Sequence, residues 1–228
     1  MNTNKNKKYN VDKYDRPSVT VDLLIFTIKD NDLQIILVRR KAWPYEGMWA
    51  LPGGFVKMDE SLEEAAKREL EQETGVKGVY LEQLYTFGDL GRDPRTRVVT
   101  VAYFALTPSD KLKLQASADS AQARWFTVKK LPNLAFDHKN IIEFGIERLR
   151  NKIGYSNIVY GLLRDKFRLS DLQKVYEVIL GQALDKRNFR KKMLSLGLLE
   201  STGQKEVDGA HRPAMLYEFK QREVVFFD

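Results

Sequence analysis

Short apolar runs alternate with amphipathic segments along the first two thirds of the chain. Two runs rich in Val, Ile and Leu, residues 19–27 and 33–38, flank a polar stretch at residues 29–32. Such a pattern predicts a β-hairpin. Three further strand-like runs follow at residues 79–87, 98–106 and 123–128.

Two helices are predicted between and after these strands. Ser61 followed by Glu64 forms a capping box, and Gly75 ends the first helix with a residue suited to positive φ. Asp137 or a neighbour is expected to cap the second helix. Its predicted apolar face contains Ile142, Ile146, Leu149 and Ile153. Strands that alternate with helices in this order predict an α/β sandwich around a mixed sheet.

The rest of the chain has a different order of elements. Ser170 and Gln173 suggest a capping box for a third helix, and Asp185 begins a fourth helix that ends at Gly197. Two short strands are predicted at residues 198–200 and 215–219, and helix, helix, then hairpin is the order of a winged helix. We therefore expect a polar arm at 1–17, an α/β domain at 18–153 and a winged-helix domain at 154–228.

Composition narrows the class of protein. The 228 residues are 43% hydrophobic, which is enough for a packed core. There is no cysteine and there are two histidines, so disulfides, thiolate zinc sites and His-rich metal sites are excluded. No apolar run approaches the roughly 18 residues of a membrane span, and a soluble, cytoplasmic protein is expected. The net charge of +7 is compatible with anionic partners but is common in proteins without them.

The first predicted helix carries carboxylates at a spacing that favours metal binding. Glu69 and Glu73 are one helical turn apart and share a face, with Gln72 beside them. Two carboxylates so placed repel each other unless a cation lies between them. Oxygen ligands of this kind suit Mg²⁺ or Mn²⁺, which in turn bind diphosphates.

This segment resembles the Nudix box. The box pattern is fitted by Gly54, Glu60, Arg68, Glu69, Leu70, Glu73, Gly75 and Val76. The resemblance implies a Nudix α/β/α sandwich and a ligand built on a nucleoside diphosphate. It also implies catalytic roles for Glu60, Arg68, Glu69 and Glu73, with Glu69 and Glu73 as the metal ligands.

Two departures from the family pattern bear on catalysis. The adjacent glutamate pair of the box is Gln72-Glu73 here, so one carboxylate is lost. Many hydrolysing relatives carry a further glutamate before a later strand, where this chain has Gln122. Because an amide cannot accept a proton, general-base catalysis would fall to Asp110, Asp119 or a box glutamate. Slow or absent hydrolysis is the expectation.

Other residues suit a nucleotide pocket. The turn-rich stretch 88–97 carries three arginines that can clamp phosphates, and three aromatic side chains, of Trp43, Trp49 and Phe87, are candidates for stacking on a base. Together with residues 49–55, this stretch resembles the ADP-ribose branch of the Nudix family. The predicted ligand-binding residues are Gly53, Gly54, Arg92, Arg95, Arg97, Trp49 and Phe87.

The fourth predicted helix is strongly basic on one side. Five of the eight residues at 185–192 are Lys or Arg, while Phe189, Met193 and Leu196 line the other side. Its position after a capped helix and before a hairpin is that of a recognition helix. The predicted DNA contacts are Lys186, Arg187, Asn188, Arg190, Lys191 and Arg212, with Lys205 and His211 in or near the wing.

The two halves together resemble Nudix-related transcriptional regulators, in which a Nudix domain is fused to a winged helix. The resemblance implies a homodimeric repressor that senses ADP-ribose or a related nucleotide or sugar metabolite, binds a palindromic operator and controls NAD or sugar metabolism. The main alternative is an active Mg²⁺-dependent ADP-ribose pyrophosphatase that yields AMP and ribose 5-phosphate. A third possibility is a protein with both activities.

Overall fold

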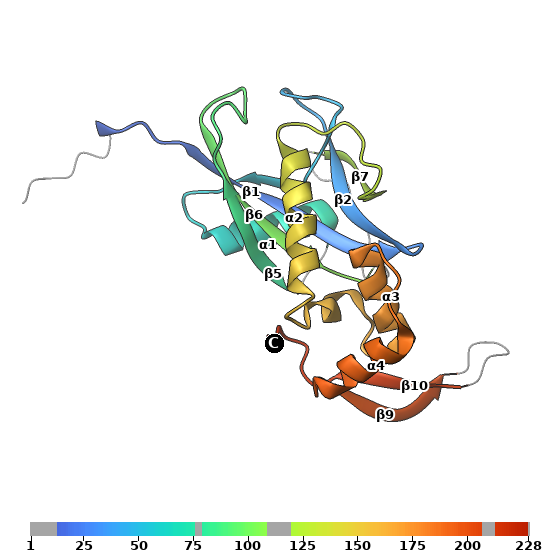
Figure 1. Cartoon of the computed structure of the whole chain (residues 1–228). Helices are drawn as coiled ribbons and strands as arrows, with labels where there is room; N and C mark the ends of the chain where they lie inside the picture. The colour runs from blue at the N-terminus through green and yellow to red at the C-terminus, as the bar shows by residue number, and fades with distance from the viewer. Residues whose placement is uncertain (1–12, 76–78, 109–119, 207–212, 228) are drawn as a thin grey trace, which may run out of the picture.

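The structure, a computed structural model, describes residues 13–75, 79–108, 120–206 and 213–227. No helix within these ranges is long and apolar enough to cross a membrane. The first domain contains one mixed sheet and two helices (Figure 1). Its strands are β1 (Ser18–Lys29), β2 (Asp32–Arg40), β3 (Trp49–Ala50), β4 (Gly53–Phe55), β5 (Leu81–Phe87), β6 (Val98–Leu106) and β7 (Ser120–Thr127).

The sheet is built around the hairpin predicted from the sequence. Its main path runs β3-β2-β1-β6-β5, while β4 pairs with β1 and β7 pairs with β2. Strands β1 and β2 are antiparallel, and the turn residues Asp30 and Asn31 have φ of 54° and 59°. Two consecutive residues of positive φ are what a tight hairpin turn requires. The pairing of β1 with β6 is parallel.

One helix covers each face of this sheet. On β1, Val21, Leu23 and Ile25 pack in the cluster that includes Ala65, Ala66 and Leu70 of α1 (Leu62–Thr74). The alternating residues of the same strand pack toward α2 (His138–Lys152). Because side chains alternate between the two faces of a strand, one apolar strand contributes to both layers. The predicted α/β/α sandwich is confirmed.

The ends of α1 match the sequence signals. Ser61 and Glu64 form the reciprocal hydrogen bonds of a capping box, and Gly75 ends the helix with φ of 71°. The start of α2 differs from expectation. Asp137 occupies the N-cap position, but its side chain makes no capping hydrogen bond. Its carboxylate binds Arg92 instead.

The second domain has the order of a winged helix. The two predicted helices and the predicted hairpin are present, and a third short strand that was not predicted, β8, completes a sheet of order β8-β10-β9. The elements are a 3₁₀ helix η3 (Ile158–Leu162), β8 (Phe167–Arg168), α3 (Leu169–Leu180), α4 (Lys186–Ser195), β9 (Leu199–Glu206) and β10 (Ala214–Phe219).

Two details of this domain correct the sequence analysis. The capping box predicted for Ser170 and Gln173 is wrong, because α3 begins earlier, directly after β8. The carboxylate of Asp171 accepts the backbone N–H of Arg168, and the Gln173 amide instead donates to Glu177 and to the carbonyl of Leu184. In addition, the first hairpin strand runs to Glu206 rather than stopping at residue 200.

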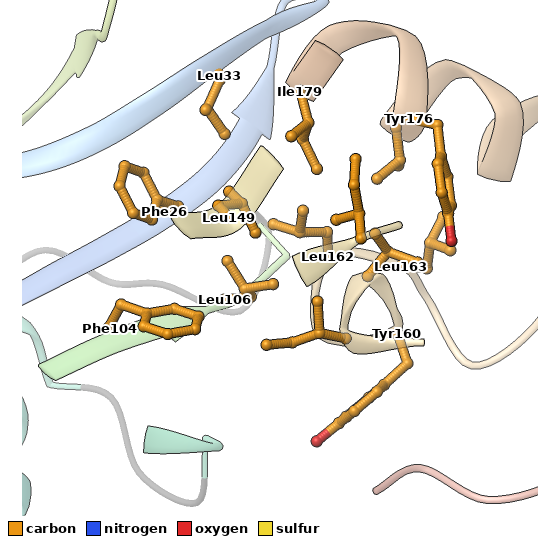
Figure 2. Packing of buried hydrophobic residues seen from close by; sticks show 14 of the residues in the cluster. Phe26, Leu33, Phe104, Leu106, Leu149, Tyr160, Leu162, Leu163, Tyr176 and Ile179 are labelled. Atoms are coloured by element: carbon orange, nitrogen blue, oxygen red, sulfur yellow. The ribbon is translucent and has the colours of Figure 1, made fainter. Parts of the chain in front are cut away.

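A continuous apolar core joins the two domains. Leu149 of α2 and Leu106 of β6 belong to the same buried cluster as Tyr176 and Ile179 of α3. Figure 2 shows these side chains close together, with Leu162 of η3 between the sheet and α3. The cluster extends to Phe189 and Met193 of α4. The winged helix is therefore anchored on the α2 side of the sandwich.

Candidate functional site

An open cavity of about 530 Å³ lies at one end of the sandwich. Strands β1 and β4, the end of β2, the loop after β5 and the start of α2 form its wall. Asp22 of β1 lies opposite Gly53 of β4 in the sheet register, which brings a carboxylate next to the glycine pair. Polar wall residues include Thr20, Asp22, Glu69, Arg92, Arg95 and His138.

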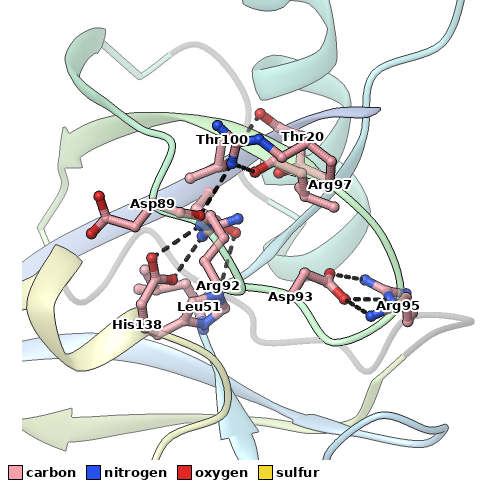
Figure 3. Close-up of polar contacts among 12 residues, drawn as sticks. Thr20, Leu51, Asp89, Arg92, Asp93, Arg95, Arg97, Thr100 and His138 are labelled. Carbon is pink, nitrogen blue, oxygen red and sulfur yellow. Dashed lines mark hydrogen bonds and ion pairs between the residues drawn. The ribbon is translucent and has the colours of Figure 1, made fainter. Parts of the chain in front are cut away.

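Arg92 is the centre of a buried charge network in this wall. Its guanidinium donates to both oxygens of Asp137, at 3.0 Å from Nε and 2.8 Å from Nη2, and Nη2 also donates to Asp22 at 3.4 Å (Figure 3). Arg92 is 9% exposed and Asp22 is 6% exposed. Buried charges require such pairing, because each loses its hydration.

His138 closes the network at the start of α2. Its Nδ1 accepts the backbone N–H of Leu51 at 2.8 Å, and its Nε2 lies 3.6 Å from the Asp22 carboxylate. Burial lowers the pKa of His138, although the charge of Asp22 opposes this shift. An acceptor role for Nδ1 requires the neutral ring with its proton on Nε2.

Arg95 presents a second guanidinium to the cavity. It binds Asp93 through two hydrogen bonds of 3.0 and 2.7 Å, and it lies over the rings of Phe55 and Phe136. Burial raises the pKa of the Asp93 carboxyl, but the hydrogen bonds from Arg95 outweigh it and leave the pKa below its usual value. The loop is thereby held with two arginines on the cavity wall.

The structure separates the predicted ligand residues into two groups. Gly53, Gly54, Arg92 and Arg95 lie on the cavity wall. The other three are turned to different neighbours. Arg97 donates to the carbonyl of Asp89 (Figure 3), Trp49 packs against Phe126, and Phe87 packs against Tyr85 and Phe144.

Several wall residues were not among the predicted ligand contacts, and Arg40, Trp43 and Phe136 are examples with large aromatic or cationic side chains. Trp43, named in the sequence analysis only as a possible stacking residue, lines the cavity and is 68% exposed. Arg40 and Phe136 also line it, and the Arg40 guanidinium lies 4.8 Å from the Phe136 ring centre. Nothing in the sequence marks Arg40 and Phe136 as ligand contacts except their positions, at the end of β2 and just before α2.

Arg68 organises the acidic residues of the box. Its guanidinium binds both oxygens of Glu60, at 2.8 and 2.6 Å, and one oxygen of Glu69 at 2.5 Å. The hydrogen bonds from Arg68, helped by the backbone N–H of Lys57, lower the pKa of Glu60 to about 2. Glu60 raises the pKa of Arg68 in return. Both groups are therefore charged at neutral pH.

Close packing surrounds both Gly53 and Gly54. A Cβ atom at Gly54 would overlap the Glu69 carboxylate. Gly53 has a φ of 154°, and a Cβ there would overlap the backbone carbonyl of Val21. Glu69 reaches the cavity wall in the space that Gly54 leaves open.

The described residues do not form a preassembled metal centre. They contain no cluster of three or more His, Asp or Glu side chains that could hold an ion. Glu69 is already paired with Arg68. Glu73 is 5% exposed, and the exposed Gln72 accepts from Arg68 at 3.4 Å. A metal role for Glu69 and Glu73 therefore stays a prediction.

The region where a catalytic base outside the box was expected is only partly described by the structure. Gln122 lies on β7 opposite Arg39 of β2. Asp110 and Asp119 lie outside the described residues. Strand β7 contains no Asp or Glu, so it supplies no carboxylate in place of the glutamate that many hydrolysing relatives carry.

The basic helix α4 has the two faces that its sequence predicts. Phe189 and Met193 are buried, and the side chains expected to contact DNA are exposed. The exposed set is Lys186, Arg187, Asn188, Arg190 and Lys191. Arg212 and His211 lie outside the described residues, and Lys205 is exposed on β9.

Within this set, Asn188 faces a different direction from the arginines. Asn188 and Lys192 line a hollow of about 510 Å³ that also contains Arg150 and Ile153 from the end of α2. Helical geometry places Arg187 and Lys191 on the side opposite the buried Phe189. The face that points away from the protein is therefore formed by Arg187, Arg190 and Lys191.

Comparison with known proteins matches both halves of the chain. The NUDIX domain matches residues 18–144, and the NrtR DNA-binding winged helix domain matches residues 159–219. The chain is 39% identical over 223 residues to the ADPR responsive transcriptional repressor NtrR of Acinetobacter baylyi, covering 96% of this chain and 88% of that protein.

Solved structures give the same result. Shewanella oneidensis NrtR in complex with a 27mer DNA superposes with a TM-score of 0.79 at 40% identity, over 89% of this chain and 93% of that one. The Nudix domain of the same protein in complex with ADP ribose matches 62% of this chain and 94% of that one, with a TM-score of 0.56 at 39% identity. The chain therefore belongs to the NrtR family, in which a Nudix domain is followed by a winged-helix DNA-binding domain.

Proposed function

We propose that this chain is an ADP-ribose-responsive transcriptional repressor. The Nudix cavity binds the effector, and the winged helix binds double-stranded operator DNA. The observation that carries this proposal is the match of nearly the whole chain, both domains in the same order, to a repressor of that description. A relative of similar length crystallised with DNA supports the second half of the proposal.

The chemistry of the cavity suits a nucleoside diphosphate sugar. Arg92 and Arg95 supply cationic donors of the kind that bind diphosphates. Trp43 and Phe55 supply exposed aromatic faces for a base, and Asp22 supplies an acceptor for ribose hydroxyls. The volume of about 530 Å³ is in the range of about 300–1,000 Å³ that is usual for small-molecule sites.

The outward face of α4 suits the major groove. Its two arginines, Arg187 and Arg190, are exposed. Arginine is the residue that most often binds guanine bidentately. In this proposal the repressor acts as a homodimer on a palindromic operator, so that two copies of α4 read half-sites one helical turn apart. Lysines such as Lys191 add contacts to phosphates.

Hydrolysis of the effector is slow or absent in this proposal. Gln72 and Gln122 stand where hydrolysing relatives carry carboxylates, and Arg68 already occupies Glu60 and Glu69. The alternative is an ADP-ribose pyrophosphatase that releases AMP and ribose 5-phosphate. Two glutamines in place of carboxylates favour the sensor over the enzyme.

Fluorescence anisotropy tests the proposal directly. The purified protein is titrated onto duplexes from upstream of its own gene and neighbouring operons, with a scrambled duplex as control and with or without ADP-ribose. Salt is held constant, because phosphate contacts dominate the affinity. We expect selective binding that ADP-ribose shifts.

Two other outcomes contradict parts of the proposal. Selective binding with no shift keeps the regulator and rejects ADP-ribose as its effector. Equal binding to the scrambled duplex rejects the regulator, and release of AMP in the presence of Mg²⁺ then supports the hydrolase.

A further inference from the structure

Two segments that lie outside both matched domains pair with each other. The segment that ends α2 and leads to η3 precedes the winged-helix match, and residues 220–227 follow it. The backbone N–H of Phe227 donates to the carbonyl of Tyr155 at 2.8 Å. The backbone N–H of Asn157 donates to the carbonyl of Val225 at 3.1 Å. The end of the chain thus returns to the junction between the domains.

Asn157 completes this pairing with its side chain. Its Oδ1 accepts the N–H of Val225 at 2.7 Å, and its Nδ2 donates to the carbonyl of Glu223 at 3.0 Å. Asn157 is 2% exposed. A buried amide that satisfies two partners on one short segment fixes the position of that segment, because losing either bond leaves a buried polar group unpaired.

The same segment contacts the end of α2. Lys152 is 4% exposed. Its ammonium pairs with Glu82 of β5 at 2.7 Å and lies 5.1 Å from the centre of the Phe226 ring. Tyr155 stacks on the same ring. We call residues 222–227 the C-terminal clasp.

The clasp also holds the first element of the winged helix. The Arg222 guanidinium donates to the carbonyls of Tyr160 and Leu163 at 3.0 Å each, and it pairs with Asp165 at 3.1 Å. One short segment therefore binds both the end of α2 and η3. Figure 1 shows the C-terminus beside the lower end of α2.

The opposite end of α2 forms part of the effector cavity. His138 lies on the cavity wall, and Asp137 is bound by Arg92. An anionic ligand that binds Arg92 would compete with Asp137 for the guanidinium and so change the contacts at the start of α2. A rigid helix with one end in the ligand site and the other at the winged helix has the position that a coupling element requires.

We propose that α2 and the C-terminal clasp couple effector binding in the cavity to the position of the winged helix. This inference rests on the proposed function and names its physical route. The shared apolar core anchors the winged helix on α2, and the clasp adds directional hydrogen bonds between the end of α2 and η3 at that junction. A ligand changes operator affinity only if the two states differ in their contacts, and the clasp transmits that difference.

The test measures coupling separately from the two binding events. Operator Kd values are determined with and without saturating ADP-ribose for the full-length protein and for Asn157→Ala, and ADP-ribose binding is measured by calorimetry. Wild type is expected to show a ratio of operator Kd values of about 5 to 150, the usual range for allosteric coupling. Asn157→Ala is expected to bind each ligand but to bring this ratio close to one.

Two further variants make the result interpretable. Lys220→Ala, an exposed side chain just before the clasp, is the matched control and keeps the wild-type ratio. Phe226→Ala removes a ring that is 64% exposed and leaves no large cavity, so it tests the clasp if Asn157→Ala does not fold. A reduced ratio in Phe226→Ala supports the proposal.

The failures of the two proposals are distinguishable. A wild-type ratio well above one that is unchanged in Asn157→Ala and in Phe226→Ala overturns the coupling role of the clasp and leaves the proposed function intact. A wild-type ratio of one rejects the proposed response to ADP-ribose, and the coupling role is rejected with it.

Discussion

The Glu69 carboxylate occupies the space that Gly54 leaves by having no side chain. A two-residue relationship of this kind explains why the box needs a glycine before its acidic helix. The glycine leaves room for the Glu69 carboxylate of α1, and Arg68 fixes that carboxylate through a hydrogen bond.

Replacing Gly54 with alanine should destabilise the protein. The new methyl group overlaps the Glu69 carboxylate, and overpacking of this kind costs about 1–3 kcal/mol. Urea unfolding measures the loss. Gly88→Ala is the control, because its Cβ would make only ordinary contacts with Val99 and Arg97. An equal loss in both variants would contradict the specific overlap with Glu69.

Arg95 and Arg97 offer a matched pair for the effector site. Arg95 lies on the cavity wall and Arg97 binds the carbonyl of Asp89. Arg95→Ala should weaken ADP-ribose binding about tenfold or more, because a hydrogen bond to a charged group is worth about 1.5–3 kcal/mol. Arg97→Ala should leave it unchanged. Calorimetry measures both, and equal losses would remove the cavity as the binding site.

The outward face of α4 makes a separate prediction. Arg187→Ala should weaken operator binding by about 1–3 kcal/mol and leave ADP-ribose binding intact. Lys192→Ala is the comparison, since Lys192 lines the hollow beside α2. Anisotropy measures the operator affinity at fixed salt. Loss of ADP-ribose binding in Arg187→Ala would contradict the assignment of α4 to DNA recognition.

Gln72→Glu tests the metal prediction. The added carboxylate restores the adjacent glutamate pair of the box, so affinity for Mn²⁺ should rise. Electron paramagnetic resonance of free Mn²⁺ measures binding without any assay of turnover. Unchanged affinity in the variant would show that residue 72 is not a ligand.

His138 makes the stability of the protein depend on pH. Burial lowers its pKa below the ordinary value of 6.5, so below pH 6.5 the unfolded chain binds a proton that the folded chain does not. Its contribution to stability is therefore present above pH 6.5 and is lost as the pH falls, with a slope of up to about 1.4 kcal/mol per pH unit.

Urea unfolding of wild type and His138→Gln between pH 7.5 and 5.5 tests this dependence. Glutamine keeps an acceptor for the N–H of Leu51 and does not titrate. The difference in unfolding free energy between the two proteins should change with pH, and a constant difference would show that His138 does not cause the pH dependence.

Features that depend on local spacing were predictable from the sequence. The hairpin turn at Asp30 and Asn31, the capping box at Ser61 and the faces of α4 each follow from residues within a few positions of one another. The wrong cap at Ser170 shows that local spacing alone does not determine where a helix begins. Several residues near a helix start resemble a cap, and the pairing of β8 with a distant strand determined which position was the first helical residue.

Residues of the cavity wall depend on contacts between distant segments. Trp43 and Trp49 are similar in the sequence, but Trp49 packs on Phe126 from β7, and that neighbour is 77 positions away. Arg92 and Arg97 lie in one loop, but Arg92 binds the carboxylate of Asp137, whereas Arg97 binds the carbonyl of Asp89. The clasp has no periodic pattern, so pairing with Asn157 is what reveals it.

The apolar core shared by α2, α3 and η3 makes the stability of each domain depend on its contact with the other. Separating the winged helix from the Nudix domain would expose Leu149 and Ile153 on one piece and Leu162 and Ile179 on the other. Exchange of DNA-binding specificity between relatives is therefore better attempted by transfer of exposed surface residues, those of α4 first, than by transfer of whole domains. Transfer of the entire winged helix would require its interface with the donor's Nudix domain to be transferred as well.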